Sequence, residues 1–360
     1  MAETEDQIGT SRGPSQVECE STRRLLCPDP VSPLSAVSVI MKRLELRVVF
    51  TLTNALWILL LVLVQGQQSF SQGTPRFRAE VDQVVVYVSV YGDDDQLVPG
   101  LKEEEFTLYE DRLEQELAGF VQTDVPSSIG IVLDSSGSMR NKMGMVEEAI
   151  DLFLDQNNPE NELFFVRFDD EVELEEDFTQ EVDDIRDAIG NVVVKGGTAL
   201  YDALYLAVDK AQDAHEPKKV LVVFTDGEDK DSYYTSEELM EKVQEADTQI
   251  FIVAFLDKQM KKSRGFFGVF KSQKEKVQNE INGIAEVTGA KAFFPDEIDE
   301  LNGIFESIAK ELKNQYRLTY ISSNRDRDGA WRRIDVKVDS AEEKKLRVRA
   351  RKGYYAPKDS

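Results

Sequence analysis

The chain has 360 residues, of which 41% are apolar, and this is enough to build the core of one large domain or of two ordinary ones. A formal net charge of −25 argues against a nucleic-acid-binding protein, because phosphate contacts need clustered cations. His215 is the only histidine, and Cys19 and Cys27 are the only cysteines, so zinc fingers, histidine-dependent hydrolases and disulfide scaffolds all lack their residues. Any metal chemistry must therefore use oxygen ligands.

The first 67 residues have the organisation of an export signal. Residues 1–40 are rich in Ser, Pro and charge, and we interpret them as a non-native or disordered extension upstream of a start at Met41. Residues 41–67 contain a cationic start, an apolar run at 48–64 and a polar exit, which together predict a signal peptide that is cleaved. The alternative is a retained signal anchor, because this run is at the short end of what spans a bilayer. We therefore expect an exported protein that is periplasmic, secreted or anchored in a membrane by residues 48–64.

Residues 77–122 have the pattern of β-strands. Val84, Val86 and Val88 alternate with other residues along one predicted strand, and a hairpin is expected around Asp111. The segment is too short for a stable core of its own, so it needs a partner elsewhere in the chain.

The region at 125–313 alternates short apolar runs with amphipathic stretches, which is the pattern of an α/β domain. Near-continuous apolar runs are typical of parallel strands buried on both faces, and they predict strands at residues 129–134, 163–168, 220–226 and 250–256. Helical periodicity predicts helices at residues 143–154, 181–189, 199–212, 236–246, 274–287 and 298–312. We interpret the acidic stretch at 169–177 as a solvated hairpin. The expected fold is a doubly wound, mostly parallel sheet.

Residues 315–357 return to the pattern of strands after this long intervening region. Because the segments at 77–122 and 315–357 are each too short to fold alone, we expect them to pack together. The sequence thus predicts a small β-sandwich-like module into which the α/β domain is inserted.

Short oxygen-bearing side chains follow the predicted strands of the α/β domain. Asp134, Ser136 and Ser138 come at the end of the first strand, Asp226 comes at the end of the third, and Thr198 precedes a helix. Ligands of open α/β sheets bind beyond the carboxyl ends of the strands, so we expect these side chains to converge. Two carboxylates and three hydroxyls suit a hard divalent cation, above all Mg²⁺, with Mn²⁺ and Ca²⁺ as alternatives.

The same residues resemble the metal-ion-dependent adhesion site of the von Willebrand factor type A domain, also called the integrin I-domain fold. The resemblance covers residues 125–313 and rests on Asp134-x-Ser136-x-Ser138, then Thr198, then Asp226, in this order. It implies that the two serines bind the metal directly and that the threonine does so when a ligand is present. The aspartates are implied to act directly or through water.

The flanking segments sharpen this resemblance. Residues 84–120 and 316–338, together with the motif RVRARKGYYAP, are similar to a bacterial von Willebrand factor A-related family first described from acidobacterial genomes. Proteins of that family are exported and mostly have no assigned role.

A basic aromatic loop is expected at residues 258–276, between a predicted strand and the next helix. Its cations and phenylalanines predict contact with an anionic membrane or an acidic partner, through Lys261, Lys262, Arg264, Phe266, Phe267 and Phe270. The alternative is a lid whose phenylalanines fold onto the domain.

We therefore expect an exported protein-binding module of the adhesion type and not an enzyme, with no catalytic residues. Mg²⁺ would keep one coordination position open, and an exposed Asp or Glu of a partner protein would fill it. Two other functions stay open. One is a structural scaffold of an envelope complex in which the metal only stabilises the fold, and the other is a metal-dependent hydrolase, for which the sequence offers no general base.

Overall fold

The computed structural model of the protein describes residues 82–122, 124–256, 273–339 and 345–358. The predicted extension and export signal, and the basic aromatic loop up to residue 272, lie outside these described residues. Within the described ranges, no helix combines the length and the apolar character needed to cross a membrane.

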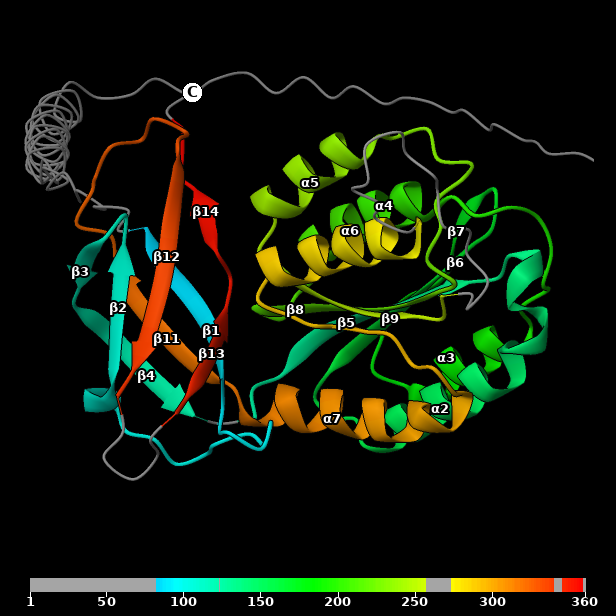
Figure 1. Ribbon diagram of the computed structural model, residues 1–360, viewed down its shortest axis with the longest axis horizontal. Helices are drawn as coiled ribbons and strands as arrows, with labels where there is room; N and C mark the ends of the chain where they lie inside the picture. Colours follow the sequence, from blue (N-terminus) through cyan, green and yellow to red (C-terminus); the bar gives the residue numbers. More distant parts are fainter. Residues whose placement is uncertain (1–81, 123, 257–272, 340–344, 359–360) are drawn as a thin grey trace, which may run out of the picture. The chain divides into compact units, whose positions relative to one another are not determined.

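The four apolar runs form the parallel core of a six-stranded sheet of order β10-β9-β8-β5-β6-β7 (Figure 1). These core strands are β5 (Ser127–Asp134), β6 (Glu162–Phe168), β8 (Lys218–Thr225) and β9 (Thr248–Ala254). At the edges, the short β10 (Ala292–Phe293) is parallel to β9, and β7 (Val172–Thr179) pairs antiparallel with β6. The predicted mostly parallel sheet is confirmed, and the acidic stretch contributes to the hairpin between β6 and β7.

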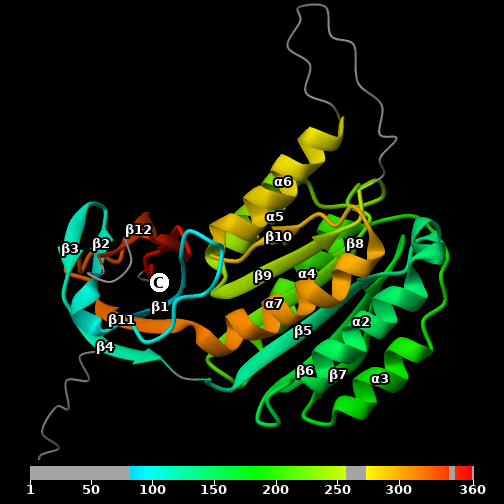
Figure 2. The same cartoon turned by 60° about the horizontal axis from the view of Figure 1, so that its bottom comes forward.

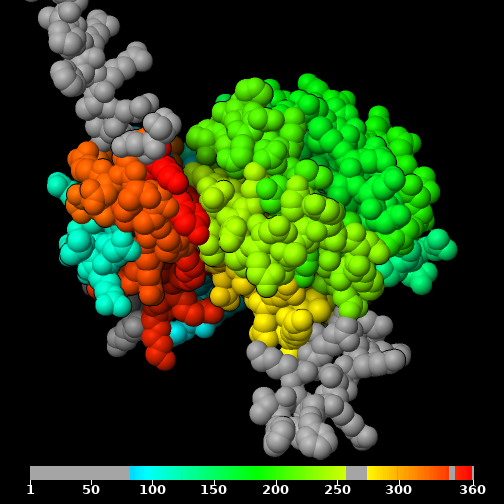
Figure 3. Space-filling view, turned by 90° about the horizontal axis from the view of Figure 1, so that it is seen from above, coloured from blue at the N-terminus to red at the C-terminus, as the bar shows by residue number. Residues whose placement is uncertain are grey.

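Helices cover both faces of this sheet, and each lies where the periodicity of the sequence predicts one (Figure 2). One layer consists of α4 (Leu200–Gln212), α5 (Ser236–Glu245) and α6 (Gln273–Val287), and Figure 3 shows this layer from outside. The other consists of α2 (Met143–Asp155), α3 (Val182–Gly190) and α7 (Leu301–Asn314), with the 3₁₀ turns η2 (Gly137–Asn141) and η3 (Ile298–Glu300) before α2 and α7. The strands between the layers are buried on both sides, which explains why their sequences are almost continuously apolar.

The α/β domain is inserted between two neighbouring strands of a β-sandwich. The chain enters the domain from β4 (Leu117–Gln122) and leaves it into β11 (Tyr316–Ile321), and these strands pair antiparallel with Gln122 opposite Tyr316. Because the entry and exit points lie side by side, the inserted domain leaves the hydrogen bonding of the sandwich intact. This arrangement confirms the predicted insertion.

The sandwich has two four-stranded sheets, with orders β13-β1-β11-β4 and β14-β12-β2-β3. Its other strands are β1 (Gln83–Tyr91), β2 (Phe106–Glu110, after the turn η1, Glu103–Glu105), β3 (Leu113–Gln115), β12 (Trp331–Val338), β13 (Arg347–Ala350) and β14 (Gly353–Tyr355). The predicted hairpin is a two-residue turn in which Asp111 and Arg112 both have positive φ, as a type I′ turn requires. Residues from both flanks of the sequence share one core.

Gly289 marks a close approach of the α/β domain to the sandwich. Its φ is +80°, and a Cβ atom at this position would lie 2.5 Å from the backbone nitrogen of Arg351. Nearby, the Lys352 backbone N–H donates to the Val287 carbonyl at 3.0 Å. A side chain at residue 289 would therefore clash with backbone that is itself held in place.

We expect Gly289→Ala to lower the free energy of unfolding by about 3 kcal/mol, because it adds left-handed backbone strain to a steric clash. The matched control is Gly303→Ala in α7, where no heavy atom lies within 4 Å of the added Cβ atom, so that stability should stay equal or rise. Urea denaturation of both variants measures the difference. Equal stabilities would show that the close approach at Gly289 is absent.

Candidate functional site

The two predicted carboxylate ligands lie together at the carboxyl-terminal edge of the central sheet. Asp134 ends β5 and Asp226 directly follows β8, and these strands are parallel neighbours. The backbone N–H of Asp226 donates to Oδ2 of Asp134 at 3.4 Å. The convergence expected from the topology is therefore present.

Hydrogen bonds hold the buried Asp134 carboxylate in one orientation. Its Oδ1 accepts from the Ser136 backbone N–H at 2.9 Å, and its Oδ2 accepts from the Thr225 hydroxyl at 2.9 Å. Burial raises the pKa of Asp134, the bonds from Ser136 and Thr225 oppose this shift, and the charge of Asp226 adds to it. A buried carboxylate beside a second carboxylate is costly without a compensating positive charge.

The remaining oxygens at this edge suit a cation. Asp226 Oδ1 is buried and has no hydrogen-bond partner in the part of the chain that the structure describes. The hydroxyl oxygens of Ser136 and Ser138 lie 3.0 Å apart. No group of three or more His, Cys, Asp or Glu side chains arranged to hold a metal occurs within the described residues, so a cation here would depend on hydroxyl ligands as well as on the two carboxylates. Such a neutral and anionic oxygen set fits Mg²⁺.

Thr198 lies in a loop that is hydrogen-bonded to the two segments that carry the carboxylates, the turn after β5 and the loop after β8. The backbone N–H of Gly137 donates to the carbonyl of Gly196 at 3.2 Å, which joins this loop to the turn after β5. The backbone N–H of Thr198 donates to Asp231 Oδ2 at 2.8 Å, which joins it to the loop after β8. The structure thus connects Thr198 to the loops of both carboxylates, and among the described residues its hydroxyl makes no hydrogen bond to either carboxylate.

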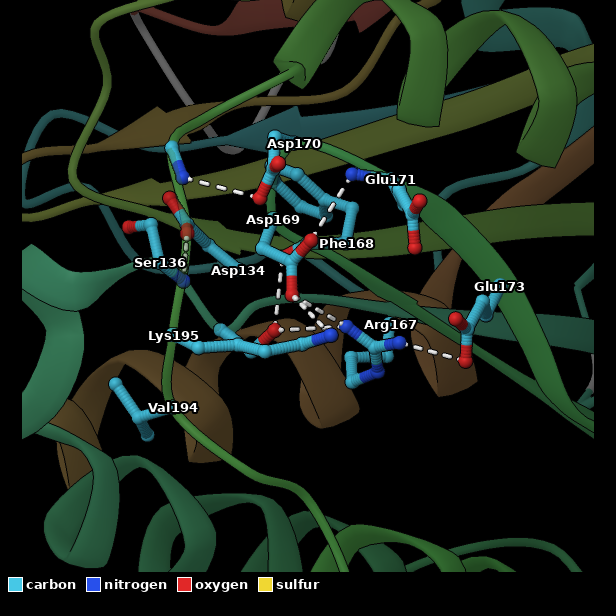
Figure 4. A network of polar contacts seen from close by, with 12 residues as sticks. Asp134, Ser136, Arg167, Phe168, Asp169, Asp170, Glu171, Glu173, Val194 and Lys195 are labelled. Carbon is cyan, nitrogen blue, oxygen red and sulfur yellow. Dashed lines mark hydrogen bonds and ion pairs between the residues drawn. The ribbon is translucent and has the colours of Figure 1, made fainter.

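An ion-pair network around the buried Arg167 was not anticipated from the sequence (Figure 4). The Arg167 guanidinium in β6 contacts Asp169 at 2.8 Å, Glu173 at 2.6 Å and Glu175 at 2.7 Å. Although burial opposes it, these carboxylates keep the pKa of Arg167 above its ordinary value. The signal in the sequence was a single arginine inside an apolar strand that an acidic stretch follows.

This network also positions the loop of Thr198. The Ala199 backbone N–H donates to the Asp169 carbonyl at 2.7 Å, and the Gly197 backbone N–H donates to Asp170 Oδ1 at 3.3 Å. Gly196 has a φ of +71°, and a Cβ atom there would lie 2.0 Å from Asp170 Oδ1. Arg167 therefore supports the site from outside it, by neutralising and holding Asp169.

The predicted partner-contact residues of the basic aromatic loop, from Lys261 to Phe270, lie outside the described residues and stay a prediction.

A comparison with known protein families finds a match over the segment that contains the candidate site. Residues 129–228 match the von Willebrand factor type A domain family. A comparison with curated proteins finds no match.

Several solved structures are similar to this chain. A von Willebrand factor type A protein from Catenulispora acidiphila is 13% identical with a TM-score of 0.43, covering 78% of this chain and 76% of that one. An aerotolerance-related membrane protein from Bacteroides fragilis is 16% identical with a TM-score of 0.40, and the match covers 52% of this chain and 98% of that one. Proximal thread matrix protein 1 from the mussel byssus is 19% identical with a TM-score of 0.44, and the match covers 57% of this chain and 51% of that one. By the family match, residues 129–228 of this chain are similar to the von Willebrand factor type A domain.

Proposed function

We propose that the protein is an exported protein-binding module of the adhesion type rather than an enzyme. In this proposal Asp134, Ser136, Ser138, Thr198 and Asp226 hold a Mg²⁺ ion, through which the module binds an Asp or Glu of a partner protein. The observation that carries the proposal is the buried Asp226 Oδ1 atom without a hydrogen-bond partner in the described residues, in a residue whose backbone N–H donates to the buried Asp134 carboxylate. Export rests on the signal at residues 41–67 and on the resemblance to the acidobacterial-type family.

Each residue has a distinct part in this proposal. A bound Mg²⁺ ion supplies a positive charge that oxygen anions can approach. Asp134 cannot rotate freely, because three hydrogen-bond donors already orient its carboxylate. Ser136 and Ser138 present neighbouring hydroxyls on the turn after β5. Thr198 is buried at the start of α4 on a loop with a fixed backbone, so that only its side chain needs to adjust when a partner binds.

The test uses a blocked Gly/Ser nonapeptide with one central Asp and its counterpart with Asn. With Mg²⁺ present, we expect the Asp peptide to bind at least about tenfold more tightly than the Asn peptide, because the amide brings no charge to the cation. EDTA should remove the difference. Thr198→Ala should lower the affinity for the Asp peptide more than it lowers the affinity for Mg²⁺. Thr198→Ser keeps the hydroxyl and should preserve both affinities. Calorimetry measures each affinity, and equal binding of the two peptides would exclude the proposal.

A further inference from the structure

We propose that Tyr233 is a partner-contacting residue that selects a Lys or Arg side chain near the partner's metal-binding carboxylate. The inference rests on the proposed function and adds to it a second contact of different chemistry. It follows from the exposure of this side chain, the rigidity of its loop and the charge around it.

Tyr233 is unusually exposed for an aromatic residue, with 87% of its surface accessible. Its ring nevertheless has an aromatic neighbour. It meets the ring of Tyr234 edge-on at 5.6 Å and 84°, and Tyr234 stacks on Tyr205 at 3.9 Å and 6°. Lys242 Nζ lies 5.1 Å from the centre of the Tyr205 ring. Tyr233 is thus the outermost member of an ordered aromatic group.

The backbone at Tyr233 is held by a single carboxylate. The backbone N–H groups of Tyr233 and Tyr234 donate to the two oxygens of Asp202 at 3.0 and 2.9 Å, and Asp202 lies in the first turn of α4. The Asp202 backbone N–H in turn donates to the Ser232 hydroxyl at 3.1 Å. A loop whose backbone is held in place before binding loses less entropy when a partner contacts it, and tyrosine is enriched among residues that dominate interfaces.

The same loop belongs to the proposed metal site. It begins with Asp226, and the carbonyl of Thr198 accepts from the backbone N–H groups of Lys230 and Asp231 at 3.0 and 3.2 Å. The position of Tyr233 is therefore coupled to that of Thr198 through short backbone links.

The charge near Tyr233 selects a cation. Residues 226–235 carry four Asp and Glu residues and one Lys, and Asp202 adds another carboxylate. The face of an aromatic ring also attracts cations. A partner with only carboxylates would be repelled by these groups and by the net charge of −25, so a Lys or Arg beside its carboxylate is the complementary chemistry.

The probes are blocked Gly/Ser peptides with one Asp and one Arg, separated by one to five positions on either side, each with a counterpart in which Gln replaces Arg. With saturating Mg²⁺, the Arg peptide of at least one spacing should bind the wild-type protein about two- to fivefold more tightly than the Gln peptide of the same spacing. Tyr233→Leu removes the ring face but keeps apolar bulk, and it should abolish this preference. Tyr233→Phe should preserve it, and Tyr355→Leu in the sandwich is the matched control. Affinities are measured by calorimetry.

Two results overturn the inference. One is an Arg preference of unchanged size in Tyr233→Leu, which would show long-range attraction alone. The other is no preference in the wild type at any spacing, as when another part of this chain covers the ring. Both differ from failure of the proposed function, which appears as Asp and Asn peptides that bind equally with or without EDTA.

Discussion

Asp226→Asn should abolish the stabilisation of the folded protein by Mg²⁺. A ligand present at about 100 times its Kd raises the free energy of unfolding by about 2.7 kcal/mol, and we expect this gain in the wild type and almost none in the variant. Without metal, the variant should be as stable as the wild type or slightly more so, because the substitution removes the charge that faces Asp134. Thermal denaturation with Mg²⁺ and with EDTA measures both effects.

The control for this experiment is Asp187→Asn, which removes an exposed carboxylate of α3. It should respond to Mg²⁺ as the wild type does. If Asp226→Asn and the wild type gain the same stability from Mg²⁺, the ion binds elsewhere and the assignment of the site is wrong.

Lys218→Met should change how the stability of the protein depends on pH. The Lys218 side chain is buried where α7 meets the sandwich: its Nζ donates to the Leu312 carbonyl at 2.6 Å and lies 5.5 Å from the centre of the Tyr87 ring. Burial lowers the pKa of Lys218 to about 8, and the charges of Asp124 and Glu311 oppose this shift. In the unfolded chain the pKa of lysine is about 10.4.

The direction in which the free energy of unfolding changes with pH follows from these two pKa values. Below pH 8 both states bind the proton, so the folded protein carries the full cost of a buried charge. Between pH 8 and about 10.4 the folded state has released a proton that the unfolded state still holds, so the free energy of unfolding rises with pH. From pH 7 to 9.5 we expect the wild type to gain about 2 kcal/mol relative to Lys218→Met.

Urea denaturation at both pH values measures this difference. Titrating tyrosines affect the wild type and the variant alike, so the difference isolates Lys218. Lys219→Met is the control, because Lys219 is only partly buried and its Nζ donates to the Gln212 carbonyl at the surface. Parallel pH profiles of the wild type and Lys218→Met would show that Lys218 keeps an ordinary pKa.

The fold class follows from local patterns in the sequence. Continuous apolar runs identified β5, β6, β8 and β9, because a strand buried on both faces is apolar at nearly every position. Helical periodicity identified the helices to within a few residues, because a helix buried on one face repeats its apolar residues at the period of the helix. The edge strand β10 is only two residues long, too short for such a trace.

The candidate site was predictable for a related reason. Parallel strands bring their carboxyl ends to one edge, so the positions of Asp134 and Asp226 in the sequence were sufficient to place them together. Metal binding by these carboxylates and the neighbouring hydroxyls stays a prediction.

The tertiary structure alone decided which polar groups are paired and which are left over. Arg167 meets its carboxylates across the β6–β7 hairpin, Lys218 meets a carbonyl that is distant in sequence, and the loop of Tyr233 is bound to Asp202. None of these follows from periodicity, since each depends on partners from separate elements. The sequence by itself determined the layers and the edge that bears the site. Their non-local packing determined the burial, and with it the pKa values and the surface that a partner would meet.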